Sequence, residues 1–124
     1  MTNQSKADKL FSEWVRRSAA DKEGFIRCYC GRIVHWKDAD ASHFVSRQFL
    51  HTRYSEKNVH PSCRKCNRFL EGNKEEYSLF LVKKYGPDIF EELNKDKRTP
   101  YWGFPYHKII AKYKEKLKEL GVDA

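Results

Sequence analysis

Four cysteines in two close pairs constrain the fold of this chain more than any other feature. Cys28 and Cys30 flank a tyrosine, and Cys63 and Cys66 have two residues between them in the stretch CRKC. Paired thiolates suit tetrahedral zinc, which has no geometric preference from d-electrons and binds sulfur well. Four protein ligands would leave no open position for water, so the expected zinc is structural.

The first cysteine pair leaves its half of the zinc site open to two interpretations. A single residue separates Cys28 from Cys30, so their chelate turn is tighter than the usual spacing. Either the turn adapts, or one cysteine is a spectator and a histidine, His35 or His60, completes the site. The N-terminal sequence has no apolar secretory segment, so we expect a cytoplasmic protein whose cysteines are thiolates and not disulfides.

Charge and size restrict the class of protein further. The chain has 124 residues, a formal net charge of +8 and a pI near 9.4. A chain of this length suits one domain whose modest core benefits from a metal. The basic balance favours a polyanionic partner such as nucleic acid, although a solvated basic surface would give the same charge. No apolar run is long enough to span a bilayer, so no membrane partner is expected.

The hydrophobic pattern predicts one domain over residues 1–124 with three parts. An apolar face at helical spacing predicts an amphipathic N-terminal helix over residues 6–22, with Gly24 marking its end. Residues 25–72 have no helical period and are rich in β-branched and aromatic residues, which indicates short strands around the cysteines. Helical periodicity returns over residues 73–124.

Two features of the C-terminal part carry expectations of their own. Asn73 precedes a helical pattern and is expected to cap the free amides of that helix. The stretch 97–107 holds four aromatic residues between two helical segments, so we expect it to dock against the body. This aromatic loop or the last helix could also supply the contact of a homodimer.

The residues between and after the cysteine pairs match the components of a one-metal phosphodiesterase. His43 is an imidazole that can take a proton from water near neutral pH. Asp38, Asp40, Asn58 and Asn67 offer carboxylate and amide oxygens, the ligands that hold a hard divalent cation. Taken singly, His43 could be a core histidine and Asn67 a helix cap.

The order of these pieces along the chain resembles the phage NinG proteins, also called Rap, a family of recombination endonucleases. The resemblance covers roughly residues 10–93. It is carried by four motifs, CYCG (28–31), DASHF (40–44), NVHPSCRKCN (58–67) and GNKEEY (72–77).

The resemblance implies an α+β fold in which a small HNH-like, treble-clef zinc core with a ββα-metal site is flanked by α-helices. By position, His43 would be the general base, and Asn58 would fix the hairpin loop through hydrogen bonds to backbone. Asn67 would be a ligand of the catalytic cation. Asp40 would be its second ligand. In many such sites the acidic ligand immediately precedes the histidine, but that position here is Ser42, so Asp38 is kept as the alternative to Asp40.

The activity implied by the resemblance is metal-dependent DNA endonuclease activity on branched or single-strand-containing recombination intermediates, such as Holliday junctions or D-loops, in the cytoplasm of a phage-infected bacterium. The cofactors would be structural zinc and catalytic Mg²⁺ or Mn²⁺. A general HNH nicking or restriction-type nuclease and a non-catalytic zinc-bound nucleic-acid-binding module are the alternatives. The candidate phosphate contacts are Arg47, Arg53, Arg64, Lys65 and Arg68.

Overall fold

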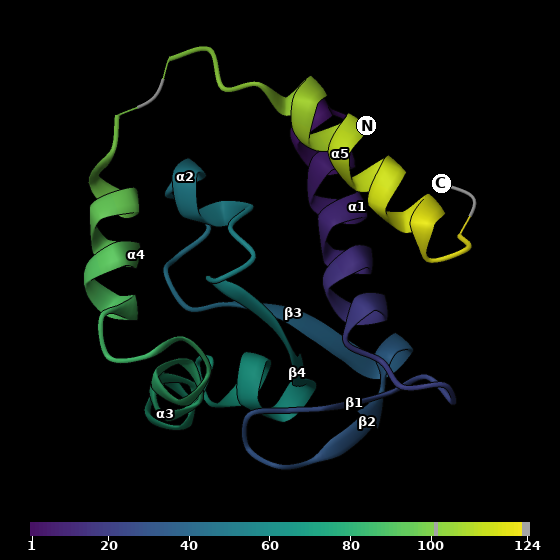
Figure 1. The fold of residues 1–124 in the computed structure, drawn as a ribbon, viewed down its shortest axis with the longest axis vertical. Helices are drawn as coiled ribbons and strands as arrows, with labels where there is room; N and C mark the ends of the chain where they lie inside the picture. The colour runs from purple at the N-terminus through teal and green to yellow at the C-terminus, as the bar shows by residue number, and fades with distance from the viewer. Residues whose placement is uncertain (101, 123–124) are drawn as a thin grey trace.

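The computed structural model describes residues 1–100 and 102–122, in which short strands alternate with helices (Figure 1). In chain order the elements are α1 (Asn3–Ser18), β1 (Phe25–Arg27), β2 (Ile33–His35), the 3₁₀ turn η1 (Trp36–Asp38), β3 (Ala39–His43), α2 (Leu50–Arg53), β4 (Val59–Cys63), the π-helical turn η2 (Lys65–Phe69), α3 (Lys74–Tyr85), α4 (Ile89–Arg98) and α5 (Tyr106–Glu119). This composition confirms the predicted α+β class.

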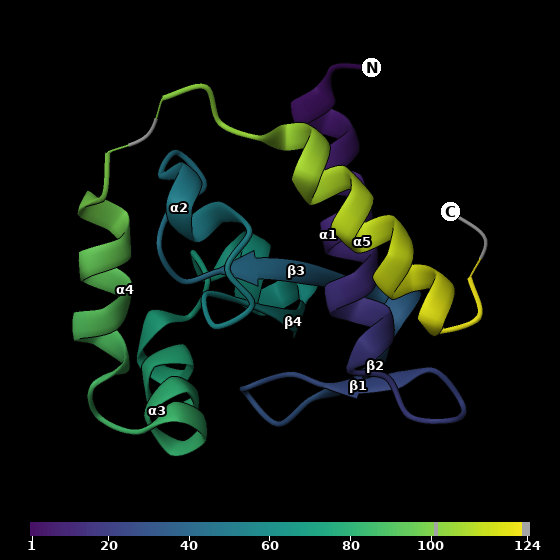
Figure 2. The ribbon, with the colours of Figure 1, turned by 45° about the horizontal axis from the view of Figure 1, so that its top comes forward.

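Two antiparallel hairpins form the centre and one edge of the molecule. β1 pairs with β2, with Ile26 opposite Val34, and the turn between these strands carries the first cysteine pair. β3 pairs with β4, with Ala39 opposite Cys63 and His43 opposite Val59. Figure 2 shows the β3–β4 hairpin between the helices and the β1–β2 hairpin at its edge. The second hairpin leads directly into η2, so it positions the second cysteine pair.

The N-terminal helix is shifted from its predicted range. α1 spans Asn3–Ser18 instead of 6–22, because the Thr2 side chain accepts a hydrogen bond from the Ser5 amide and starts the helix early. After the helix, the Asp21 carboxylate accepts hydrogen bonds from the amides of Glu23 and Phe25 and bends the chain into β1. α1 therefore ends before Gly24, which belongs to that bend.

Two apolar clusters hold the helices against the central hairpin. In the first, Phe11 and Val15 of α1 pack with Tyr113 of α5 and with Val59 of β4, and α5 runs beside α1 in both views (Figures 1 and 2). The second cluster joins α3 and α4 through Tyr77, Leu81, Ile89 and Leu93. Each fully buried aliphatic or aromatic side chain contributes roughly 1.5–3 kcal/mol.

The aromatic loop docks at one of its ends. The ring of Phe104 stacks on Tyr54 with the ring centroids 5.8 Å apart, whereas Trp102 is 94% exposed. Residue 101, part of the same predicted segment, and residues 123–124 at the end of the predicted helical part lie outside the described residues. Among the described residues, no helix has the length and apolar character needed to cross a membrane.

Candidate active site

The four cysteines meet between the two hairpins, at one end of η2. Their sulfur atoms all lie within 4.8 Å of one another, and the Sγ atoms of Cys30 and Cys63 are 3.8 Å apart. A tetrahedron with Zn–S bonds of about 2.3 Å has edges of about 3.8 Å. The tight first turn adapts because Gly31 takes a φ of +93° and its amide donates to the carbonyl of Cys28 at 2.8 Å.

The electrostatics of this cluster suit a cation. Burial raises the pKa values of the Cys28 and Cys66 thiols, so their thiolates are costly without a compensating positive charge. Three of the four cysteines are buried, and Cys30 is exposed at the surface. The cluster can therefore hold a structural metal such as zinc, with all four ligands supplied by sulfur.

Asn73 has a different role from the predicted helix cap. Its side chain makes no capping hydrogen bond, and its Nδ2 instead lies 3.4 Å from the Sγ of Cys66 as a donor. The residue takes a left-handed conformation with φ of +50°, which turns the side chain back toward the cluster. Donors of this kind orient and stabilise metal ligands from outside the coordination sphere.

The two alternative histidine ligands lie elsewhere. His60 is buried, with its Nδ1 3.0 Å from the hydroxyl of Tyr77 and its Nε2 2.7 Å from the hydroxyl of Tyr85. Burial lowers the pKa of His60 to about 4, so its ring is neutral at pH 7. His35 accepts a hydrogen bond from the amide of Lys37 in η1. His60 therefore joins the central hairpin to α3, and the all-cysteine interpretation holds.

Asp40 and Asn67 are brought together by the pairing of β3 with β4 and by the η2 turn. The Nδ2 of Asn67 donates to the Asp40 carboxylate at 3.1 Å, and Arg68 donates to both carboxylate oxygens at 2.8 and 2.9 Å. Partial burial alone would raise the pKa of Asp40, but the hydrogen bonds from Arg68 and Asn67 outweigh it and lower that pKa. Asp38, the alternative ligand, is an exposed residue of η1.

These residues line a depression of about 400 Å³ that we call the Asp40 cleft. Five basic residues surround its single carboxylate: Arg16, Lys37, Arg47, Arg64 and Arg68. Arg47, Arg64 and Arg68 were predicted from the sequence as phosphate contacts, and they do gather here. Lys65 is exposed on η2 and is not among the lining residues. The cleft is suited to an anionic ligand.

His43 ends β3 and lies in a second, adjoining depression of about 210 Å³, the His43 pocket. His43 is three positions after Asp40 in β3, so the two side chains leave opposite faces of the strand, roughly 10 Å apart along it. The cleft and the pocket share Ser12, Ala41 and Arg47 as lining residues. The structure thus places His43 beside the Asp40–Asn67 pair without direct contact.

The His43 ring is held in one tautomer. Its Nε2 lies 3.0 Å from the carbonyl oxygen of Arg53. Since a carbonyl can only accept, Nε2 carries the proton and the lone pair is on Nδ1. Burial lowers the pKa of His43 to about 4, and the charges of Arg47 and Arg53 act in the same direction. The neutral ring therefore has an atom that can accept a proton at pH 7.

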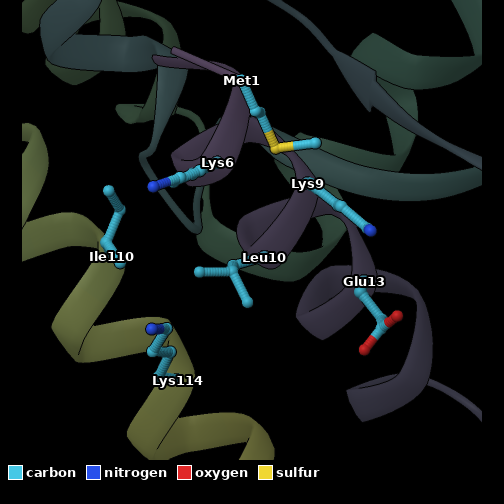
Figure 3. A pocket seen from close by; sticks show the side chains of 7 residues that line it. All are labelled: Met1, Lys6, Lys9, Leu10, Glu13, Ile110 and Lys114. Atoms are coloured by element: carbon cyan, nitrogen blue, oxygen red, sulfur yellow. The ribbon is translucent and has the colours of Figure 1, made fainter. Parts of the chain in front are cut away.

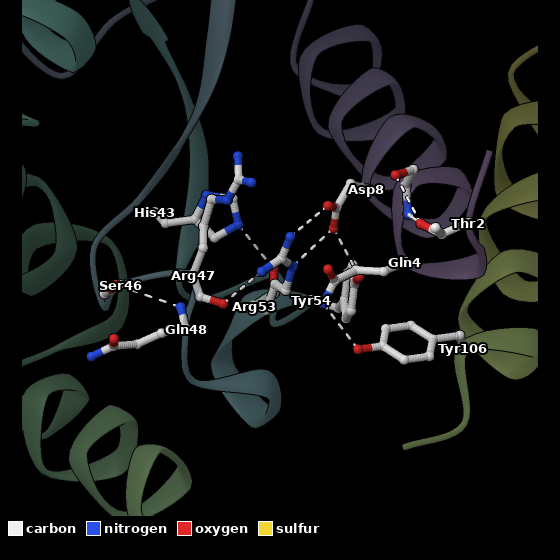
Figure 4. A network of polar contacts seen from close by, with 11 residues as sticks. Thr2, Gln4, Asp8, His43, Ser46, Arg47, Gln48, Arg53, Tyr54 and Tyr106 are labelled. Atoms are coloured by element: carbon white, nitrogen blue, oxygen red, sulfur yellow. Dashed lines mark hydrogen bonds and ion pairs between the residues drawn. The ribbon is translucent and has the colours of Figure 1, made fainter. Parts of the chain in front are cut away.

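A polar network from α1 supports the carbonyl that holds His43 (Figure 4). Asp8 accepts from the Nε and Nη2 of Arg53 at 2.9 and 2.5 Å and from the Tyr54 hydroxyl at 2.8 Å. The Nη1 of Arg53 donates to the carbonyl of Arg47 at 2.8 Å. The prediction that Arg53 contacts phosphate is therefore corrected, because Arg53 is 8% exposed and its donors are used inside the protein.

Asn58 is fully buried and holds the loop between β3 and β4. Its Oδ1 accepts from the amide of Val45 at 2.7 Å, while its Nδ2 donates to the carbonyls of Val45 and Thr52. These are the hydrogen bonds to backbone that the family resemblance implies for this position. Asn58 therefore fixes the path of the loop that follows His43 and leads to α2.

Sequence reasoning missed the contribution of the first helix to the site. Asp8, Ser12 and Arg16 of α1 all line the His43 pocket or the Asp40 cleft. They are spaced four residues apart, so they form one polar stripe along the helix. That stripe beside the apolar face was a readable signal in the sequence. The partner of the stripe, however, lies in β3, which the helical pattern does not reveal.

Comparison with known proteins places the chain in a family. The model of the family described as Bacteriophage Lambda NinG protein matches residues 2–122. The ninG proteins of Salmonella phage P22 and Escherichia phage lambda are 29% and 28% identical to the chain, each over 88% of its length. The chain spans 58% of the length of these two relatives. No solved structure matches it. Since the family match covers nearly all of its residues, the chain belongs to the NinG family.

Proposed function

We propose that this chain is a zinc-stabilised, HNH-like DNA endonuclease whose site is built from β3, β4 and η2. The observation that supports this proposal most strongly is the pairing of Asp40 with Asn67 in a cleft lined by arginines. The adjoining pocket holds His43, a neutral histidine whose Nδ1 is unprotonated. Zinc on the four cysteines would be structural, and the β3–β4 hairpin followed by η2 supplies a hairpin and a helical turn next to the cysteines, in the order that the resemblance implies.

The proposed chemistry assigns one role to each residue. The Nδ1 of His43 takes a proton from water as the water oxygen attacks phosphorus and the bond to the leaving 3′ oxygen breaks. Asp40 and Asn67 would hold Mg²⁺ or Mn²⁺, and the cation would supply positive charge to stabilise the leaving oxygen. Arg47, Arg64 and Arg68 bind phosphate oxygens, and Asn58 holds the loop behind His43.

The two depressions suit a phosphodiester that spans them. Ala41 lines both the Asp40 cleft and the His43 pocket. Its small side chain lets a sugar–phosphate backbone approach β3 between the cation ligands and the base. The substrate that we propose is a branched recombination intermediate, which is what the resemblance of the motifs to the phage NinG proteins implies.

A second candidate is a zinc-held module that binds nucleic acid without cutting it. It is favoured by the ion pair of Arg68 with both oxygens of Asp40, which occupies the oxygens that a cation would need. In this alternative the cleft binds phosphate through its other basic residues, and Asp40 serves only to place Arg68.

Cleavage of a labelled four-way junction and a matched linear duplex, in Mg²⁺ or Mn²⁺ with structural zinc present, separates these candidates. We expect the wild type to cut the junction preferentially and the Asp40→Ala and Asn67→Ala variants to lose at least tenfold in rate. Equal cutting of both substrates would indicate a general HNH nuclease. Tight binding with no cutting in either cation would establish the non-catalytic module.

A further inference from the structure

A third depression continues the surface that begins at the Asp40 cleft. It lies between α1 and α5, has a volume of about 370 Å³, and we call it the α1–α5 groove. Lys9 lines both this groove and the His43 pocket, just as Ser12 and Arg47 line both the pocket and the Asp40 cleft. The three depressions therefore adjoin one another along α1.

The rim of the groove is positively charged. Lys6 and Lys9 of α1 and Lys114 of α5 are all exposed there (Figure 3). Within residues 1–100 and 102–122, none of these three lysines has an ion-pair partner. The one acidic residue of the groove, Glu13, pairs with Arg17 at 3.6 Å. The rim thus presents free ammonium groups to an anion.

The floor of the groove is apolar. Leu10 and Ile110 lie between the two helices, and Met1 closes one side (Figure 3). Both Leu10 and Ile110 are half-buried and pack against the first apolar cluster. A ligand that fills this groove must therefore offer an apolar surface to its floor and negative charges to its lysine rim.

We propose that the α1–α5 groove holds a single strand of nucleic acid that continues from the Asp40 cleft past His43. Arg16, Ser12, Lys9 and Lys6 follow one another along α1 beside the path, over roughly 15 Å of helix at 1.5 Å per residue. This inference rests on the proposed function, because it takes DNA as the ligand of the cleft. It adds that one strand of the substrate is unpaired on this side of His43.

An unpaired strand matches the groove better than a duplex or an acidic peptide. Unstacked bases and sugars can lie on Leu10 and Ile110 while their phosphates reach the lysines, as in other single-strand grooves. A duplex keeps its bases stacked inside and would present only phosphates to the apolar floor. An acidic peptide could meet the rim, but the groove adjoins the His43 pocket, which in turn adjoins the arginine-lined cleft, and this order favours one polyanion along all three depressions.

Binding of two labelled DNAs tests the proposal: a splayed duplex with a single-stranded thymidine arm and the same duplex with blunt ends. The His43→Ala protein serves as background so that cutting does not interfere. The groove variant replaces Lys6, Lys9 and Lys114 of this His43→Ala protein with alanine together. The matched control replaces three exposed lysines that line none of the three depressions, Lys95, Lys108 and Lys112. Melting temperatures verify that both variants fold.

We expect the groove variant to bind the splayed DNA on the order of tenfold more weakly and to retain its affinity for the blunt duplex. Its slope of log affinity against log salt should fall by about 2, because each single-strand phosphate contact contributes about 0.7. The control variant should change neither value. The proposal would be overturned if both variants lost the same affinity, or if the groove variant lost the same affinity for both DNAs. It would also be overturned if a glutamate peptide at matched charge displaced the splayed DNA.

This experiment separates the groove from the chemistry. If the wild type fails to cut but the groove variant loses the single-strand preference, the groove assignment stands and the nuclease proposal fails. If the wild type cuts and the groove variant binds both DNAs normally, the nuclease proposal stands and the groove assignment fails.

Discussion

At the scale of single residues, Asp40 has two competing uses. Its carboxylate now accepts hydrogen bonds from Asn67 and from Arg68, whose side chain is 54% exposed. An exposed guanidinium costs little to move, since surface ion pairs are screened by solvent and contribute little to stability. Under the proposed function, a cation that enters the cleft takes the place of Arg68, which is then available for a phosphate.

We predict that Arg68→Ala strengthens binding of Mn²⁺ to the zinc-loaded protein several-fold without DNA, because the competing cation is removed. Titration calorimetry with Mn²⁺ measures this. Arg64→Ala is the control, since Arg64 lines the same cleft and donates to the carbonyl of Lys37 instead of to Asp40. Equal gains in the two variants would mean that only the general charge of the cleft matters.

Asp8 carries a second prediction at this scale. Asp8→Ala leaves the guanidinium of Arg53, whose side chain is 10% exposed, without its anionic partner. We expect the free energy of unfolding to fall by about 2–3 kcal/mol in urea denaturation. Glu92→Ala, which breaks the exposed Lys57–Glu92 pair, should cost less than about 0.5 kcal/mol. Similar costs for both would contradict the structural role given to Asp8.

At the scale of elements, the turn between η2 and α3 couples the cysteine cluster to the helix. Glu71 and Asn73 both have φ of +50°, with Gly72 between them at +91°. Left-handed residues other than glycine are strained, and such strain persists where the surroundings require it. At Asn73 the strain is compensated by the hydrogen bond that its side chain donates to the Cys66 sulfur.

We therefore expect Asn73→Gly to lower zinc affinity by about tenfold, measured by competition with a chelator. Glycine accepts the left-handed conformation, so the loss would reflect the missing donor and not a distorted turn. Glu71→Gly relieves the same kind of strain two residues earlier and should leave zinc affinity unchanged. A loss of affinity in Glu71→Gly as large as in Asn73→Gly would assign the effect to the turn.

At the scale of the whole molecule, the sequence predicted the parts of the site better than their arrangement. Cysteine spacing indicated the four-sulfur cluster, and the motifs identified the Asp40, Asn58 and Asn67 positions. His43 lies in a pocket of its own because successive side chains of β3 point to opposite faces of the strand. Arg53 is buried because Asp8 of α1 accepts hydrogen bonds from its guanidinium. Both are contacts between segments far apart in the sequence, which local periodicity does not report.

The buried histidines give the molecule a pH dependence. Burial lowers the pKa values of His43 and His60 from 6.5 to about 4, so the unfolded chain binds more protons between these limits. Stability from this source is complete above pH 6.5 and is lost as the pH falls toward 4. We expect the drop in melting temperature from pH 7 to pH 5, with excess zinc, to be smaller in His60→Gln. The exposed His107→Gln should leave that drop unchanged.

The most direct test of the nuclease proposal is the cleavage rate of a labelled four-way junction by His43→Ala beside the wild type, with zinc and Mg²⁺ or Mn²⁺ present. The proposal predicts a loss of at least about a hundredfold, since general bases contribute that much or more. The variant should still bind the junction and should lose only about 1 kcal/mol of stability, the worth of the hydrogen bond to Arg53. Cutting by His43→Ala at the wild-type rate would contradict the assignment of His43 as the base.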